Sequence, residues 1–344
     1  MTMTTIPGST RAAVLHGPED LRIERVPVPP PGPGEVLVAV DAVGVCGSDM
    51  HYFADGRNGG NVLRQPTVLG HEASGVITAA GEEVRLPIGA RVAIEPAIGC
   101  GDCPTCRSGR YNLCPAGTCF GSPPTDGTIA EHVVAPARAV HRLPEEIDTE
   151  LGALIEPLAV AVWAARRAGI RFGHRVLVTG AGPIGILVAQ VARAAGAAEV
   201  VVTDVNDDRL GKAAELGATA TVNTATHTLG LTAMDRLVEC SGHPGALWQG
   251  IQALGPGARA TVVGQAPPAV DGLPLAYLQR WEIDLSTAFR YANAFPAAIA
   301  LASSGRVDLA GLVTGRFPLD QTAVALRAPG RDPRHLKVVI RPAA

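Results

Sequence analysis

The stretch Val176-Leu-Val-Thr-Gly-Ala-Gly-Pro-Ile-Gly185 decides the fold of this chain. Its first four residues are apolar or β-branched and predict a buried strand. Gly180, Gly182 and Gly185 then follow in Gly-x-Gly-x-x-Gly spacing. The first glycine permits a tight turn, the second lets the backbone approach a pyrophosphate, and the third lets a helix pack on the strand. Because a helix N-terminus favours negative charge, the stretch predicts a dinucleotide-binding turn between strand and helix.

The sequence around and after this stretch alternates between strand and helix patterns. The predicted strands are Val176–Thr179, Val200–Thr203, Leu237–Glu239 and Ala260–Val263, and the predicted helices are Ile184–Ala195 and Asp208–Leu216. Such alternation indicates a parallel sheet wrapped by helices.

Asp204 directly follows the second predicted strand. A carboxylate at this position would accept hydrogen bonds from the ribose hydroxyls of the adenosine. Its charge repels a 2′-phosphate, which favours NAD over NADP. Arg209 is near in sequence and could face the same ribose. A glycine-rich turn in an ordinary α/β fold is the alternative interpretation, and the position of Asp204 argues against it.

Four cysteines form a dense cluster in Cys-x2-Cys-x2-Cys-x7-Cys spacing, at Cys100, Cys103, Cys106 and Cys114. Four thiolates at short spacing form a closed tetrahedral zinc site with no open position for chemistry. An iron–sulfur cluster can also use four cysteines. Two disulfides are disfavoured because nothing marks the chain as secreted. We interpret residues 99–115 as a structural zinc lobe.

A second set of metal-ligand types flanks this lobe. Cys46 lies in Gly44-Val-Cys-Gly-Ser-Asp49, and His71 and Glu72 lie in Gly70-His-Glu-Ala-Ser-Gly75. Each residue alone has an ordinary interpretation as a buried thiol or a hydrogen-bonded side chain. Glu156, however, stands in a strongly apolar stretch where an unpaired carboxylate would be costly. A metal ion, or water on that ion, would explain why Glu156 is there.

Length and composition exclude several classes of function. The chain has 344 residues, enough for two domains of about 150 residues each. Its net charge is −3 without a basic run, which argues against nucleic acid and anionic membrane surfaces as partners. No apolar stretch reaches the about 20 residues of a membrane span. Residues 1–11 lack the apolar core of a signal peptide, so a cytoplasmic location is expected.

The N-terminal half of the chain differs from the α/β pattern. Residues 11–150 read as all-β, with short alternating runs such as Glu35–Val45 and Arg91–Ile94 separated by glycine and proline. Residues 150–170 read as helical. The predicted fold class is therefore α/β plus all-β, with the nucleotide turn in the second part.

With these motifs, the chain resembles the zinc-dependent medium-chain dehydrogenases, specifically the sorbitol (polyol) dehydrogenase branch. The resemblance covers nearly the whole chain and includes Gly44–His51, Gly70–Gly75, Gly152–Val160, Gly173–Gly185, Asp204–Arg209, Glu239–Gly242, Phe289–Pro296 and Thr314–Leu319. It implies a GroES-like β-barrel catalytic domain over 1–157, completed by 292–344, and a Rossmann domain over 158–291. The connection Val222–Leu237 is shorter than in the family, so a crossover helix should be truncated or replaced by a loop.

The resemblance also implies roles for single residues. Cys46, His71 and Glu72 look like ligands of a catalytic zinc, and Glu156 looks like the residue that holds its water or moves onto the metal. With the cysteine lobe, this implies two zinc ions per chain. Tyr52, Glu156, Arg290 and Tyr291 match positions that contact the substrate. The expected cofactor-binding residues are Gly180, Gly182, Pro183, Ile184, Gly185, Asp204, Arg209, Val263, Gly264, Gln265, Phe289 and Arg290.

The implied reaction is reversible hydride transfer between a secondary alcohol of a polyol and NAD. Ser48, His51 and Glu156 would carry the proton, although His51 could equally be a surface histidine. The family hosts alternatives: oxidation of a sugar acid such as idonate, a diol, threonine or a cyclitol. Segment Cys119–Gly127 departs from the family and puts the substrate in question.

Two rival classes are a non-catalytic dinucleotide-binding protein and a zinc-ribbon interaction protein. The intact set of metal-ligand types argues against the first, because a binding module needs no open metal site. The enzyme-like length argues against the second. The resemblance implies a homotetramer, with a dimer as the alternative.

Overall fold

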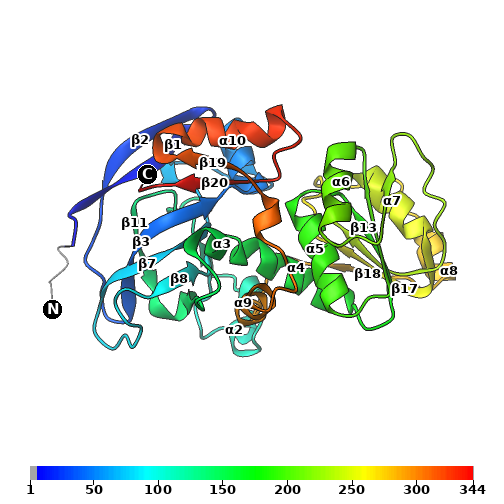
Figure 1. The fold of residues 1–344 in the computed structure, drawn as a ribbon, viewed down its shortest axis with the longest axis horizontal. Helices are drawn as coiled ribbons and strands as arrows, with labels where there is room; N and C mark the ends of the chain where they lie inside the picture. The colour runs from blue at the N-terminus through cyan, green and yellow to red at the C-terminus, as the bar shows by residue number, and fades with distance from the viewer. Residues whose placement is uncertain (1–5, 344) are drawn as a thin grey trace. The chain divides into compact units, whose positions relative to one another are not determined.

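The computed structural model describes residues 6–343. Residues 1–5, part of the start in which no signal peptide is expected, lie outside the described residues. The chain divides into two compact units (Figure 1). The barrel unit comprises Met1–Glu156 with Val313–Ala344, and the sheet unit comprises Pro157–Leu312. No described helix has both the length and the apolar character needed to cross a membrane.

A seven-stranded sheet forms the centre of the barrel unit. Its order is β12-β8-β7-β3-β20-β19, with β11 also paired to β3, and a three-stranded sheet has the order β2-β1-β6. The two sheets share one hydrophobic core. The strands are β1 (Ser9–Gly17), β2 (Asp20–Pro27), β3 (Glu35–Gly44), β6 (Thr67–Val68), β7 (Glu72–Ala80), β8 (Arg91–Ile94), β11 (His132–Pro136), β12 (Val140–Arg142), β19 (Val313–Pro318) and β20 (Lys337–Arg341).

Shorter elements surround these sheets. Strands β4 (Arg57–Asn58) and β5 (Asn61–Val62) form one hairpin, and β9 (Ala97–Ile98) pairs with β10 (Thr118–Cys119). The helices of this unit are α1 (Gly47–Asp55), α2 (Pro104–Arg107), α3 (Thr149–Ala153) and α10 (Thr322–Arg331), and α4 (Ile155–Ala168) begins at its boundary.

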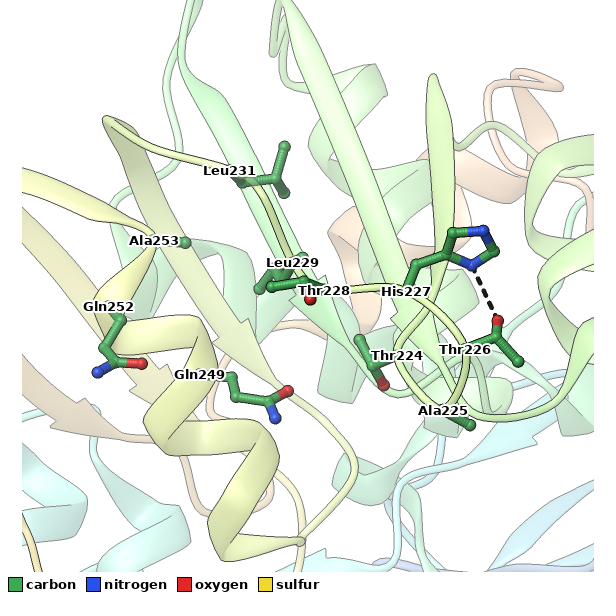
Figure 2. A pocket seen from close by; sticks show the side chains of 10 residues that line it. All are labelled: Thr224, Ala225, Thr226, His227, Thr228, Leu229, Leu231, Gln249, Gln252 and Ala253. Atoms are coloured by element: carbon green, nitrogen blue, oxygen red, sulfur yellow. Dashed lines mark hydrogen bonds between the residues drawn. The ribbon is translucent and has the colours of Figure 1, made fainter.

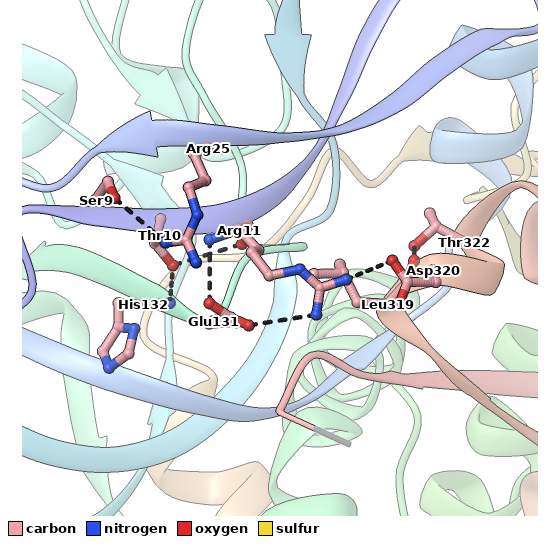
Figure 3. A network of polar contacts seen from close by, with 9 residues as sticks. All are labelled: Ser9, Thr10, Arg11, Arg25, Glu131, His132, Leu319, Asp320 and Thr322. Atoms are coloured by element: carbon pink, nitrogen blue, oxygen red, sulfur yellow. Dashed lines mark hydrogen bonds and ion pairs between the residues drawn. The ribbon is translucent and has the colours of Figure 1, made fainter.

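The C-terminal segment is part of the barrel unit. Strand β20 pairs antiparallel with β3, with Val339 opposite Gly44. A network of polar contacts also links the C-terminal segment to the N-terminal strand β1 (Figure 3). Arg11 of β1 donates its backbone N–H to Glu131 at 3.1 Å, and its guanidinium pairs with Asp320, which precedes α10. The ion pair between Arg11 and Asp320 thus joins the N-terminal strand to the C-terminal segment.

The sheet unit contains six parallel strands in the order β15-β14-β13-β16-β17-β18. They are β13 (Arg175–Thr179), β14 (Glu199–Asp204), β15 (Ala220–Asn223), β16 (Met234–Glu239), β17 (Leu254–Val262) and β18 (Asp284–Thr287). The strand order reverses between β13 and β16. In open parallel sheets, ligands bind at the carboxyl ends of the strands at such a point.

Helices α5 (Pro183–Ala194), α6 (Asp207–Glu215), α7 (Pro244–Gln252) and α8 (Leu275–Arg280) connect most of these strands. Helix α9 (Phe295–Ser303) follows the last strand, β18. Helix α5 buries a continuous apolar face that includes Ile186, Leu187 and Val191. Between β15 and β16 the described chain forms a loop without a helix, as its short length predicted.

The boundary between the two units differs from the domain boundary expected from the sequence. Residues 292–312 group with the sheet unit, whereas the sequence analysis placed them with the catalytic domain. Reciprocal hydrogen bonds join part of this segment to the sheet unit: Gln190 of α5 donates to the carbonyl of Asp308 at 3.1 Å and accepts its N–H at 2.7 Å. Side-chain bonds of this kind leave no signal in local sequence patterns.

Candidate metal and nucleotide sites

The three residues expected to bind a catalytic metal lie together in the barrel unit. One possible ligand atom from each of Cys46, His71 and Glu72 lies within 4.8 Å of the others. Cys46 follows β3 and precedes α1, while His71 and Glu72 stand at the start of β7. Strands β3 and β7 are antiparallel neighbours with Gly44 opposite Glu72, so the sheet register brings both motifs to one edge.

Gly44 makes room for this arrangement. A Cβ atom at Gly44 would lie 2.1 Å from Oε2 of Glu72, far inside contact distance. No other residue type can therefore stand there without moving Glu72. The glycine of the first motif has a packing role toward the acidic residue of the second.

Asp49 holds the two motifs together. Its side chain is fully buried, Oδ2 accepts the N–H of Cys46 at 3.0 Å, and Oδ1 accepts the N–H of Gly70 at 3.2 Å. Oδ1 also lies 3.5 Å from Nδ1 of His71. A carboxylate beside one ring nitrogen orients a metal-binding histidine and leaves Nε2 for the metal. Asp49 was not predicted, although it lies within the motif Gly44–Asp49.

Charge at this site favours a cation. Burial lowers the pKa of His71, but the charges of Asp49 and Cys46 outweigh this and raise it well above its ordinary value of 6.5. A thiolate, an imidazole and a carboxylate are the donor types that catalytic zinc sites use, with a further position left open. The residues therefore fit a zinc ion, which would take the place of the imidazolium proton.

Lys337 adds an unexpected buried cation. It donates to Oε1 and Oε2 of Glu72, both at 2.8 Å, and to the carbonyl of Val45 at 3.0 Å. Burial lowers its pKa, but the charges of Glu72 and Cys46 outweigh burial and raise it. The sequence contained a sign of this buried lysine, because Lys337 is one of only two lysines in the chain and stands at the start of an apolar strand.

The residues expected to move a proton differ in how deeply they are buried. Glu156 is 7% exposed at the start of α4, outside the group of three possible ligands, and its charge acts on Lys337. Ser48 is half-buried in the first turn of α1. His51 is exposed on the same helix, with Nδ1 3.7 Å from Asp55. The structure thus places His51 at the surface.

Tyr52, an expected substrate contact, has a defined orientation. It is 2% exposed, and its hydroxyl oxygen accepts a hydrogen bond from Nδ2 of Asn61 at 2.8 Å. The same amide nitrogen donates to the carbonyl of Pro123 at 3.1 Å, which ties Tyr52 to the segment that departs from the family. Asn61 was not predicted, and only the fold brings it to Tyr52.

The four-cysteine lobe has the spacing that a zinc site requires. The sulfurs of Cys100 and Cys106 are 4.0 Å apart, and those of Cys103 and Cys114 are 3.7 Å apart. Zinc–sulfur bonds of about 2.3 Å in a tetrahedron give sulfur–sulfur separations of about 3.8 Å. The hydroxyl of Thr105, followed by the N–H of Cys106, lowers the pKa of Cys103 to about 6. The donors thus fit a structural zinc ion.

A buried carboxylate links this lobe to the barrel sheet. Glu95 is 6% exposed, and its Oε1 accepts the hydroxyl of Tyr111 in the lobe at 2.5 Å. Its Oε2 lies 2.7 Å from Nε2 of His141 in β12. The lobe therefore has a fixed attachment besides its two chain ends.

The glycine turn in the sheet unit opens onto a cavity of about 540 Å³. Its lining includes the expected residues Gly180, Gly182, Asp204 and Arg209, and also Ser241, which was not predicted. No protein atom lies within 4 Å of a Cβ built at Gly182, whereas one at Gly185 would lie 1.8 Å from the carbonyl oxygen of Gly180. The second glycine thus leaves space for a ligand and the third serves packing. The residues fit a dinucleotide phosphate at the start of α5.

Five of the remaining expected cofactor residues lie in two places, at the start of α5 and after β17. Pro183 and Ile184 form the first positions of α5. Val263, Gly264 and Gln265 follow β17 at the carboxyl ends of the strands, where a Cβ at Gly264 would lie 2.3 Å from the Gly242 nitrogen.

The segment after β18 presents both exposed and buried side chains. Phe289 is 55% exposed, and the guanidinium carbon of Arg290 lies 4.9 Å from the centre of its ring. Tyr291 is fully buried and packs on Phe295, with ring centres 5.5 Å apart. Phe289, Arg290 and Tyr291 all belong to the sheet unit.

A second cavity of about 470 Å³ lies beside the loop between β15 and β16 (Figure 2). Loop residues 224–229 and Leu231 line one side, and Gln249, Gln252 and Ala253 line the other. Thr224 and Gln249 line both cavities. The cavity beside this loop therefore adjoins the cavity at the glycine turn.

Comparisons with known proteins agree with this geometry. Residues 32–145 match the family "Alcohol dehydrogenase GroES-like domain", and residues 183–304 match the family "Zinc-binding dehydrogenase". Sorbitol dehydrogenase of Macaca fascicularis is 42% identical over 324 residues, which cover 91% of this chain and 90% of that protein. Sorbitol dehydrogenase of Bacillus subtilis (strain 168) is 38% identical over 350 residues, covering 98% and 99%.

A solved structure supports the same relationship. L-idonate 5-dehydrogenase from Escherichia coli has a TM-score of 0.91 at 30% sequence identity, covering 97% of this chain and 98% of that one. The expected pairing of a GroES-like β-barrel with a Rossmann sheet is thereby confirmed. The chain belongs to the zinc-dependent medium-chain dehydrogenases, in their sorbitol dehydrogenase-like branch.

Proposed function

We propose that this protein catalyses reversible hydride transfer between a secondary alcohol of a polyol and NAD. The observation that carries the proposal is the open donor set of Cys46, His71 and Glu72 in a chain that also has a nucleotide cavity. Curated relatives at 38–42% identity are sorbitol dehydrogenases, which supports a polyol as the substrate class.

Cys46, His71 and Glu72 would hold the catalytic zinc. When bound, zinc supplies Lewis-acid chemistry that lowers the pKa of an alcohol. Asp49 keeps His71 in the required orientation, and Gly44 leaves room for Glu72. Ser48 and Glu156 are the groups that can take up and pass on the alcohol proton, and exposed His51 can release it to solvent.

The sheet unit would bind NAD along the carboxyl ends of its strands. The turn Gly180–Gly185 would receive the pyrophosphate, and Asp204 would accept the ribose hydroxyls. Arg209 lines the same cavity, so the preference for NAD depends on Asp204 dominating there. Cys100, Cys103, Cys106 and Cys114 would hold a second zinc that stabilises the lobe.

Arg290 and Tyr52 would select the substrate through its further hydroxyls. A guanidinium offers five donors in a fixed geometry, which suits a polyol and equally suits a carboxylate. The likeness to an L-idonate dehydrogenase makes a sugar acid the second candidate.

We also propose that the protein works in the cytoplasm as a homo-oligomer, a tetramer or a dimer. Thiolates available to metal fit a reducing compartment. Among the described strands, β18 pairs only with β17, so its outer edge is open to a second copy of the chain.

The decisive experiment measures NAD reduction across five- and six-carbon polyols, aldonates, short diols, threonine and cyclitols. Polyols should give the highest kcat/KM, and Cys46→Ser should abolish turnover of every substrate while NAD still binds. Arg290→Ala should harm polyols far more than 2-propanol. Preference of the parent enzyme for aldonates would replace the polyol by the sugar acid, and turnover that survives Cys46→Ser would refute the metal mechanism.

A further inference from the structure

Lys337 is a buried cation that the function proposed above does not use. Its side chain is 4% exposed and that of its partner Glu72 is 1% exposed. The ammonium donates to both oxygens of Glu72 and to the carbonyl of Val45. These three bonds use every N–H of the ammonium, so Lys337 is held rigidly within the protein.

Glu72 therefore faces two cations. One is Lys337, and the other is the metal ion that Glu72 can hold with Cys46 and His71. A carboxylate has about four acceptor positions, so Glu72 can contact both at once. Each cation nevertheless draws charge from the same carboxylate, so each weakens the attraction of Glu72 for the other.

We propose that Lys337 is a positioning residue that holds Glu72 and competes with zinc for its carboxylate, so that Glu72 is the weakest of the three ligands. The proposal rests on the zinc site proposed above. Cys46 and His71 remain the firm ligands, and Lys337 keeps Glu72 beside the site when the metal contact is broken.

The location of Lys337 supports this competition. It begins β20, the C-terminal strand that pairs with β3, directly next to the strand end that leads to Cys46. Glu156 adds a further negative charge that acts on Lys337. Without Lys337, a bound metal would balance the buried charge of Glu72 without a competing ammonium.

A purely structural ion pair makes a different prediction. Removing one partner of such a pair lowers stability because a buried charge loses its counter-charge. If Lys337 only held Glu72 in place, its loss would leave Glu72 less well placed, and the affinity of the site for metal would stay the same or fall. A gain in metal affinity therefore separates competition from structural support.

Lys337→Met tests the proposal, because methionine keeps an unbranched apolar stem and removes the charge. The metal-free variant should unfold at a lower temperature than the metal-free parent. Its catalytic site should bind zinc at least about tenfold more tightly in a chelator competition, which corresponds to about 1.4 kcal/mol. Cobalt in place of zinc should show an altered absorption spectrum, because Glu72 binds it more closely. Lys212→Met changes the only other lysine, which pairs with Glu215 on the surface, and should leave all three measurements unchanged.

His71→Ala identifies the catalytic site in these titrations. If this variant and the parent bind the same number of zinc ions with the same affinities, the proposed zinc site itself is wrong. If His71→Ala loses one zinc but Lys337→Met binds that zinc no more tightly than the parent, competition by Lys337 is refuted. If Lys337→Met does not fold, the double variant Glu72→Gln/Lys337→Met decides. This double variant should fold and should bind the catalytic zinc more weakly than the parent. If it does not fold, Lys337 is a packing residue and the proposal is overturned.

Discussion

Asp204 accepts a hydrogen bond from the backbone N–H of Ala181 at 2.7 Å, so the residue expected to choose the cofactor also holds the glycine turn. Its other oxygen accepts the N–H groups of Val205 and Asn206 at 2.8 and 3.0 Å. One carboxylate thus joins the end of β14 to the turn after β13. Any ribose hydroxyl must share it with these backbone donors, and substitutions will therefore affect both the cofactor and the turn.

Asp204→Asn should raise the kcat/KM for NADP relative to that for NAD, because the amide removes the repulsion of a 2′-phosphate while keeping an acceptor oxygen. Asp204→Ala should shift the ratio in the same direction and also lower stability by about 1–3 kcal/mol, since three backbone N–H groups, that of buried Ala181 among them, lose a charged acceptor. Steady-state kinetics and denaturant unfolding separate the two effects. Asp208→Asn on exposed α6 is the matched control, and a parent enzyme that already prefers NADP would contradict this role of Asp204.

The two proposed zinc ions should differ in lability. Four cysteines enclose one site, whereas Cys46, His71 and Glu72 leave the other open to solvent ligands. A mild chelator should therefore remove about one zinc per chain and all activity before the protein unfolds. Elemental analysis and circular dichroism at successive times follow both processes. A folded and fully active preparation whose one zinc is bound by the cysteine lobe would disprove the catalytic assignment.

The raised pKa of His71 predicts how pH acts on the metal-free protein. A group whose pKa is higher in the folded state contributes stability that is complete below its ordinary pKa and is lost as pH rises through the folded value. Metal-free protein should therefore lose stability as pH increases from 6.5, the ordinary value, through the raised one. Zinc affinity should increase over the same range, because zinc needs the neutral imidazole.

Thermal unfolding at several pH values, with and without zinc, tests this behaviour. His132 and His174 have lowered pKa values caused by burial and contribute the opposite slope. The difference between the parent and His71→Asn isolates the His71 contribution. A difference that does not change with pH would show that the His71 pKa is not raised.

Local patterns predicted much of this protein. The glycine spacing at 180–185 predicted a turn between a strand and a helix, and the structure has this turn between β13 and α5, because its backbone demands are contained in six consecutive residues. The cysteine spacing predicted the lobe for the same reason. The residues at 46, 71 and 72 are separated in sequence; their types and the buried Glu156 suggested the grouping, and the family resemblance supplied their role as ligands of a catalytic zinc.

Residues that act across long separations were not predicted. Lys337 reaches Glu72 over 265 positions, and Gln190 reaches Asp308 over 118. Their partners are set by sheet register and helix packing, which no local pattern contains. Asp49 differs, since it lies three positions from Cys46, but its bond to Gly70 becomes visible only when both loops are placed.

Asn61 provides the sharpest test of how the substrate is recognised. The carbonyl of Pro123 can only accept, so the atom of Asn61 that faces it is Nδ2, which has two N–H groups. The second N–H points to the hydroxyl oxygen of Tyr52. The oxygen of Tyr52 therefore accepts from Asn61, so the position of this hydroxyl depends on Asn61.

Asn61→Asp has nearly the same shape and reverses this polarity, because a carboxylate accepts the Tyr52 proton. We expect KM for a five- or six-carbon polyol to rise about tenfold, equivalent to about 1.4 kcal/mol of lost binding. KM for 2-propanol, which has no further hydroxyl, should change little. Tyr52→Phe should cause a similar loss, and the double variant should lose no more than either single variant, since both remove one interaction. Equal damage to both substrates, or additive losses in the double variant, would mean that Asn61 supports the local fold and does not direct the Tyr52 hydroxyl.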